Sequence, residues 1–134
     1  MIEPGEEVDE LARPVIGAAM EVHTILGAGF LESTYEQALA VEFAPRGIPP
    51  QRQWPIALNY KDHPVGEARL DFLVGDKLIV ALKAVDSIHP IHNAQVLNDL
   101  KATGLSLGLL INFNVEHLKG AIKRIVLTHS NPSP

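Results

Sequence analysis

The two apolar runs on either side of Gly75-Asp76 constrain the fold of this chain most, because a charged residue stands inside each of them. The runs cover residues 69–74 and 77–85 and are rich in Val, Ile, Leu and Phe, which is typical of the strands of a buried hairpin. A charge inside such a strand is costly unless it is paired or binds a metal. Asp71 and Lys83 therefore indicate a site, or else they are strand-end charges that reach water.

The length of the loop between the two runs decides whether Asp71 and Lys83 share a face of the hairpin. A two-residue loop turns Asp71 away from Lys83. A three-residue loop instead pairs Val74 with Leu78. In that register Asp71 lies opposite Ala81 and on the same face as Lys83. We predict the three-residue loop, because three-residue hairpins with a bulge are common.

The remaining pattern predicts one α/β domain in the order helix, helix, three strands, helix, strand, short helix, strand. Apolar residues at three- and four-residue steps predict helices over about 9–26, 31–44 and 88–102. Strands are expected over 52–60, 65–74, 77–85 and 105–113, a helical turn over 115–119, and a strand or helix over 121–127. The single domain spans 1–134, with about 10–127 structured and with 1–8 and 128–134 flexible. The pattern assigns Leu31, Tyr35 and Trp54 to the core.

The composition of the chain argues against several classes of function. The absence of cysteine excludes thiol nucleophiles and thiolate zinc sites and fits a cytoplasmic protein, and no apolar run reaches the ~20 residues of a membrane span. A net charge of −5 argues against a generally basic nucleic-acid binder. Residues 1–42 hold nine acids against one arginine, whereas residues 43–134 hold ten bases against seven acids. These bases either face a phosphate backbone or are scattered over the surface: Lys77, Lys83, Lys101, Lys119, Lys123 and Arg124.

An acid on one strand and a lysine on its partner form the geometry of a metal-dependent phosphodiesterase. In such sites carboxylates hold Mg²⁺, which activates water and offsets charge on the phosphate. The lysine orients or deprotonates the water, or stabilises the pentavalent state.

The chain resembles the small bacterial GxxExxY proteins, which lie within the PD-(D/E)XK nuclease superfamily. The naming motif is present as Gly29-Phe-Leu-Glu32-Ser-Thr-Tyr35. Further stretches that look like the family are 16–23, 26–29, 91–95, 103–104 and 109–114, so the resemblance covers about residues 10–127.

This resemblance implies a restriction-endonuclease-like α/β core, a mixed sheet flanked by helices, and Mg²⁺- or Mn²⁺-dependent hydrolysis of nucleic acid. Asp71 would be the acid of the family's Asp…Glu-x-Lys signature and Lys83 its lysine. Glu32 would be the helix carboxylate that points into the site and binds metal together with Asp71. Gln95 would contact the substrate or order the site.

The chain departs from the family pattern at two positions. The Glu-x-Lys signature reads Ala81-Leu-Lys83, so the second metal-holding carboxylate is missing. Four residues after Gln95, where the related pattern usually has tyrosine, this chain has Asp99. Positions 95 and 99 share a helix face, so Asp99 is either a migrated metal ligand or a solvated helix acid.

Ala81 leads us to expect weak metal binding and low or absent nuclease activity, either in a naturally degenerate member or after introduction of the alanine to inactivate the protein. The alternatives are a non-catalytic binding or scaffold protein on the nuclease fold and, with less support, a small-molecule-binding protein. Nucleic acid is the candidate partner, a homo-oligomer is compatible with each reading, and no membrane association is expected.

Overall fold

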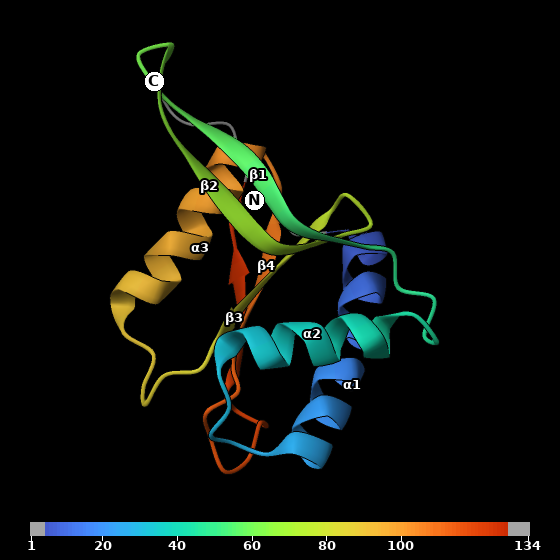
Figure 1. Ribbon diagram of the computed structural model, residues 1–134. Helices are drawn as coiled ribbons and strands as arrows, with labels where there is room; N and C mark the ends of the chain where they lie inside the picture. Colours follow the sequence, from blue (N-terminus) through green and yellow to red (C-terminus); the bar gives the residue numbers. More distant parts are fainter. Residues whose placement is uncertain (1–4, 129–134) are drawn as a thin grey trace.

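Five strands form one mixed sheet that separates two helices from a third (Figure 1). The computed structural model describes residues 5–128. The helices are α1 (Glu6–Leu26), α2 (Glu32–Phe43) and α3 (Pro90–Thr103). The strands are β1 (Pro50–Tyr60), β2 (His63–Val74), β3 (Leu78–Lys83), β4 (Leu107–Asn112) and β5 (Ile122–Val126). The predicted α/β class and the mixed sheet flanked by helices are confirmed.

The strands lie in the order β1-β2-β3-β4-β5. Neighbours are antiparallel except β3 and β4, which are parallel. Parallel strands need a long crossover, and α3 supplies it by passing over one face of the sheet. This crossover lays α3 over the sheet, where it contacts β1, β4, β5 and also β3 of the charged hairpin.

The predicted three-residue hairpin loop is confirmed, because Val74 pairs with Leu78. Gly75 and Asp76 have φ values of 58° and 59°, in the left-handed region that glycine adopts most readily. A Cβ on Gly75 would also lie 2.8 Å from Cδ1 of Leu11 on α1. The same register pairs Phe72 with Val80, and Asp71 and Ala81, the neighbouring residues of the two strands, both line the cavity described below.

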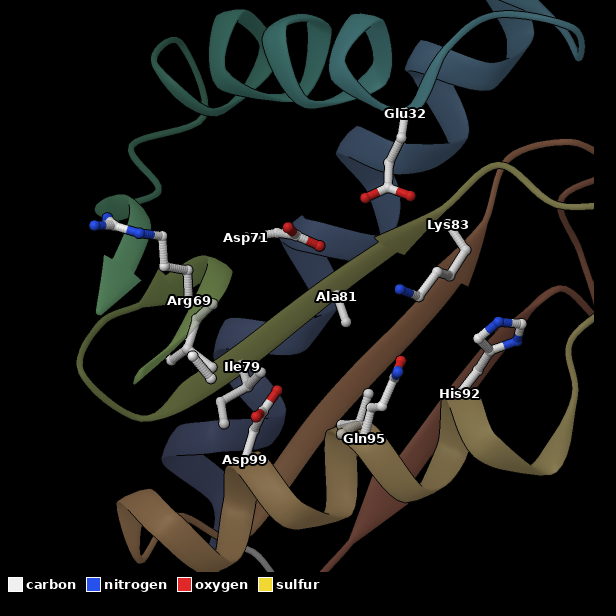
Figure 2. Close-up of a pocket in the computed structure, with 12 residues that line it drawn as sticks. Glu32, Arg69, Asp71, Ile79, Ala81, Lys83, His92, Gln95 and Asp99 are labelled. Atoms are coloured by element: carbon white, nitrogen blue, oxygen red, sulfur yellow. The ribbon is translucent and has the colours of Figure 1, made fainter. Parts of the chain in front are cut away.

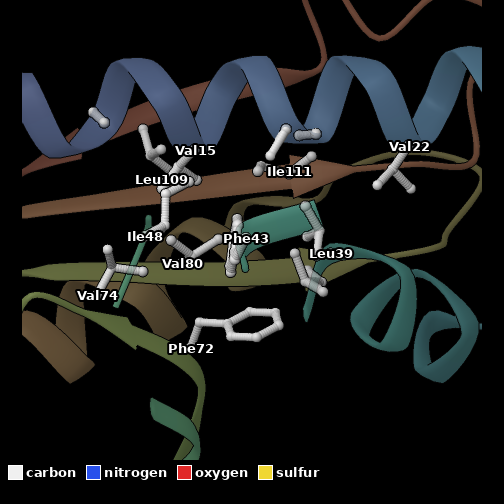
Figure 3. Packing of buried hydrophobic residues seen from close by; sticks show 14 of the residues in the cluster. Val15, Val22, Leu39, Phe43, Ile48, Phe72, Val74, Val80, Leu109 and Ile111 are labelled. Carbon is white, nitrogen blue, oxygen red and sulfur yellow. The ribbon is translucent and has the colours of Figure 1, made fainter. Parts of the chain in front are cut away.

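Alternation along β3 sends its side chains to two different cores, of which Figure 3 shows the larger one. Leu78, Val80 and Leu82 face α1 and α2 and pack into the larger cluster with Val15 and Phe43. A smaller cluster lies on the α3 face. Its buried members are Ile56, Leu70, Leu73, Ile79 and Leu100. Residues 79, 81 and 83 therefore share the α3 face.

Several element boundaries differ from the prediction. Helix α1 begins at Glu6, so residues 6–8 belong to it, while the parts of the predicted flexible ends at 1–4 and 129–134 lie outside the described residues. Residues 115–119 form bends and a turn rather than a helical turn, and the Val115 carbonyl lies 2.8 Å from Nε2 of the His23 side chain. The ambiguous segment 121–127 contains strand β5, which pairs with β4.

Two residues assigned to the core are exposed. Leu31 is 75% exposed because it precedes α2 as its N-cap residue. Trp54 is 40% exposed, because much of the β1–β2 hairpin extends beyond the helices and shows both faces to solvent. Tyr35, by contrast, is fully buried as predicted.

Within residues 5–128, none of the helices combines the length and the apolar character needed to cross a membrane.

Candidate functional site

A cavity of about 270 Å³ opens between the sheet and α3 (Figure 2). Four elements contribute its polar lining: α2, β2, β3 and α3. The predicted site residues that line it are Glu32, Asp71, Ala81, Lys83, Gln95 and Asp99. The fold thus brings together residues that are as much as 67 positions apart in the sequence.

Asp71 is held by the neighbouring strand. Its Oδ2 accepts a hydrogen bond of 2.8 Å from the backbone N–H of Leu82. In Figure 2 the amino group of Lys83 reaches across the cavity from β3, and the amide of Gln95 rises toward it from α3. The methyl group of Ala81 faces the same space, so the cavity is lined at that point by carbon where the family signature has a carboxylate.

The GxxExxY segment forms the turn that directs Glu32 into the cavity. Gly29 has φ of 102°, which L-residues with a side chain rarely adopt, and Glu32 is the first residue of α2. The hydroxyl of Tyr35 donates to the Gly27 carbonyl at 2.6 Å and accepts from the Phe30 N–H at 3.2 Å. Tyr35 is therefore a clamp on the α1–α2 turn as well as a core residue.

Burial raises the pKa of all three cavity acids, and repulsion by a neighbouring acid raises each pKa further. Burial raises the pKa of Glu32, and the nearby Asp71 raises it further. Burial likewise raises the pKa of Asp71, although the hydrogen bond from the Leu82 N–H acts in the opposite direction and lowers it. Burial and repulsion by Asp71 raise the pKa of Asp99 to about 6. Lys83 favours the ionised form of all three, so these groups form one electrostatic unit.

The carboxylates suit a hard divalent cation by their chemistry but not by their spacing. Among residues 5–128, no three acidic or histidine side chains lie close enough together to hold a metal ion. With alanine at position 81, the residues therefore do not fit a resident Mg²⁺ or Mn²⁺. Metal ligation by Glu32, Asp71 and Asp99 stays a prediction.

Two polar residues outside the predicted catalytic and metal-binding set also line the cavity, Arg69 and His92. His92 Nδ1 accepts the backbone N–H of His89 at 3.0 Å, which caps α3. The three-residue spacing of His89 and His92 is therefore the spacing of a helix cap. Because Nδ1 is the acceptor, neutral His92 carries its proton on Nε2. The one signal for Arg69 is its position two residues before Asp71.

A mixed sheet with an acid and a lysine on adjacent strands, covered by a helix that carries a glutamine, defines a nuclease-like α/β domain. The family model of the PD-(D/E)XK nuclease superfamily matches residues 9–125. The chain belongs to this superfamily. No curated protein and no solved structure matches the chain.

Proposed function

We propose that this chain is a PD-(D/E)XK nuclease-fold protein whose metal-dependent phosphodiester hydrolysis is impaired or lost because position 81 is alanine. The observation that carries the proposal is the placement of Ala81 on the cavity wall, between Asp71 and Lys83. The cavity keeps the acid, the lysine, the helix carboxylate and the glutamine that the family resemblance implies. Only the middle carboxylate of the signature is missing.

The remaining residues have roles that do not depend on a bound metal. Lys83 places a cation in the cavity wall, where it can bind the oxygens of a phosphodiester. The guanidinium of Arg69 is paired with Glu67 at 3.3 Å and points away from the cavity in Figure 2. Gln95 offers amide donors and acceptors to a base, a sugar or a phosphate. Nucleic acid is therefore the substrate class or ligand class that we propose.

Restoring the carboxylate tests the proposal. We expect Ala81→Glu to bind Mg²⁺ or Mn²⁺ at millimolar concentrations by titration calorimetry and to cleave DNA or RNA oligonucleotides in the presence of the metal. The cavity leaves room for the longer side chain. The matched control is Ala81→Gln, which has nearly the same shape without the charge and should neither bind the metal tightly nor cleave.

A second control separates the site from contaminating nuclease. Adding Asp71→Asn to Ala81→Glu should abolish cleavage while the chain remains folded by circular dichroism. The proposal is wrong if Ala81→Glu neither binds metal nor cleaves. It is also wrong if the unaltered chain cleaves as fast as Ala81→Glu.

Non-catalytic binding of nucleic acid is the second candidate function, and the lack of a three-ligand cluster in the described part of the chain favours it. We expect fluorescence anisotropy without metal to detect binding of a labelled single- or double-stranded oligonucleotide, weakening with salt. Lys83→Ala should weaken that binding, whereas Lys119→Ala, remote from this cavity, should not. Unchanged binding in Lys83→Ala would exclude the cavity as the contact, and absence of binding at low salt would leave only a scaffold role.

A further inference from the structure

Gln53 has a backbone conformation that is rare for its residue type. Its φ is 50°, in the left-handed region, although it lies within strand β1 rather than in a turn. The pairing of β1 with β2 joins Arg52 to Phe72 and Trp54 to Leu70, and it omits Gln53 and Asp71 between them. A strained residue that persists in a strand is held by its surroundings and is often found at a functional site.

The side-chain alternation of β2 also changes phase at Asp71. Leu70 and Leu73 both pack into the cluster under α3, although they are three residues apart. Phe72 and Val74 pack into the cluster on the opposite face. A regular strand would send residues 70 and 73 to opposite faces, so the ladder is locally irregular where Asp71 enters the cavity.

The side chain of Gln53 lies next to two carboxylates at this irregularity. Its Nε2 donates to Oε1 of Glu36 on α2 at 2.6 Å. Gln53 also faces Asp71 across the two strands, between the Arg52–Phe72 and Trp54–Leu70 pairs, and its side chain lowers the pKa of the Asp71 carboxyl. Arg52 donates to the other oxygen of Glu36 at 2.8 Å, and Arg69 donates to the Gln53 carbonyl at 3.2 Å. The amide therefore lies in a network that connects α2, β1 and β2.

We infer that Gln53 and Glu36 are positioning residues: Gln53 holds the Asp71 carboxylate toward the cavity, and Glu36 holds the Gln53 amide in place. A glutamine amide suits this role because its two N–H donors serve two carboxylates at once. Glu36 does not line the cavity and is bonded to Gln53, so it acts through Gln53 on Asp71 rather than on a ligand. The inference deepens the proposed function, because it names what orients the acid of that site.

A purely structural role for Gln53 makes a different prediction from a positioning role. If the residue only fills an irregular strand, replacing it by glycine relieves the left-handed φ and has no effect on Asp71. If Gln53 positions Asp71, the same substitution keeps or raises the stability of the fold but releases the carboxylate. Gln53→Gly is thus the decisive variant, with Gln51→Gly as the matched control from an exposed position of the same strand.

The first measurement is amide hydrogen exchange in the chain with Ala81 as it stands. In Gln53→Gly we expect the Leu82 amide to exchange about five- to tenfold faster, the change that loss of one hydrogen bond produces. The Val80 amide in the same strand should be unaffected, which excludes global destabilisation. Gln51→Gly should change neither amide selectively.

The second measurement uses the Ala81→Glu background and rests on the proposed function. There we expect Gln53→Gly, and also the isosteric Gln53→Glu, to lower Mn²⁺ affinity by about ten- to a hundredfold, as is common for partners that orient a ligand. Unchanged Leu82 exchange and unchanged Mn²⁺ affinity in Gln53→Gly would overturn the inference. If Ala81→Glu binds no metal at all, the proposed function fails, and the Leu82 exchange rate alone decides whether Gln53 positions Asp71.

Discussion

Asp99 is the residue whose charge state is most altered by its place in the fold. Burial beside Asp71 raises its pKa from 3.8 to about 6. Between these two values the folded chain binds more protons than the unfolded chain, so the free energy of unfolding falls as the pH rises through this window. The destabilisation that ionised Asp99 causes is fully present at pH 7 and absent below about pH 4.

Asp99→Asn should therefore stabilise the protein at pH 7 and leave it nearly unchanged at pH 4. The shift from 3.8 to about 6 sets an upper bound near 3 kcal/mol, and solvent screening of this partly exposed group reduces our expectation to about 1–2 kcal/mol. Urea unfolding at both pH values measures it, with Glu116→Gln at an exposed position as the control. Equal stability of Asp99→Asn and the unaltered chain at pH 7 would contradict the electrostatic account.

The same variant addresses the hypothesis that Asp99 is a migrated metal ligand. If Asp99 supplies a carboxylate to the metal, Asp99→Asn should lower the Mn²⁺ affinity of the Ala81→Glu protein. Unchanged affinity would make Asp99 a helix acid that only repels Asp71. Titration calorimetry distinguishes the two outcomes.

At the scale of the elements, the close approach of α3 to β4 determines the shape of the cavity. A Cβ on Gly108 of β4 would lie 2.7 Å from Cγ1 of Val96, which also lines the cavity from α3. Gly108→Ala should thus push α3 away from the sheet at a cost of about 1–3 kcal/mol. We expect Val96→Ala to offset part of this cost, because it removes the clashing methyl group.

A double-mutant cycle in urea checks this contact. The coupling between Gly108→Ala and Val96→Ala should be about 0.5–3 kcal/mol and of the sign that makes the double variant more stable than the sum predicts. Gly66→Ala, where the nearest side-chain atom lies at an ordinary 3.8 Å, is the control glycine. If the two effects on the free energy of unfolding are strictly additive, the packing of α3 does not depend on Gly108.

These elements also show which parts of the architecture were readable in advance. Strong periodicity was sufficient to predict the helices and the order of the strands along the chain. The glycine turn was sufficient to predict the hairpin register that puts Asp71 and Lys83 on one face. The exposed Trp54 was misassigned, because an apolar residue in a strand does not reveal how far the helices extend over the sheet. Gln53 was missed because neither its left-handed φ nor its pairing with Glu36 leaves a pattern in a single sequence.

At the scale of the whole molecule, the acid-rich N-terminal segment and the basic remainder are joined rather than kept on separate surfaces. Glu7 pairs with Lys77, and Asp9 pairs with Arg124 at 2.9 Å. Two of the six bases that we considered for a phosphate backbone are therefore already paired with α1. This pairing fits a chain of net charge −5 that binds nucleic acid only locally, at its cavity.

Both ion pairs are exposed, so they should contribute little to folding. We expect Asp9→Asn to change the free energy of unfolding by less than about 1 kcal/mol, and 0.5 M salt to reduce the difference further. The exposed Glu21→Gln on the same helix is the control. A loss of several kcal/mol in Asp9→Asn would show that the α1 contact depends on this pair.

The irregular backbone at Gln53 also affects the outer edge of the sheet. Strand β1 is an edge strand of 11 residues, and long flat edges invite a strand from another chain to add to them and start aggregation. Its left-handed residue and Pro55, which has no N–H to donate, interrupt the row of backbone groups that such a strand would need. We therefore expect the distortion at Gln53 to hinder the addition of a strand from another chain to this edge as well.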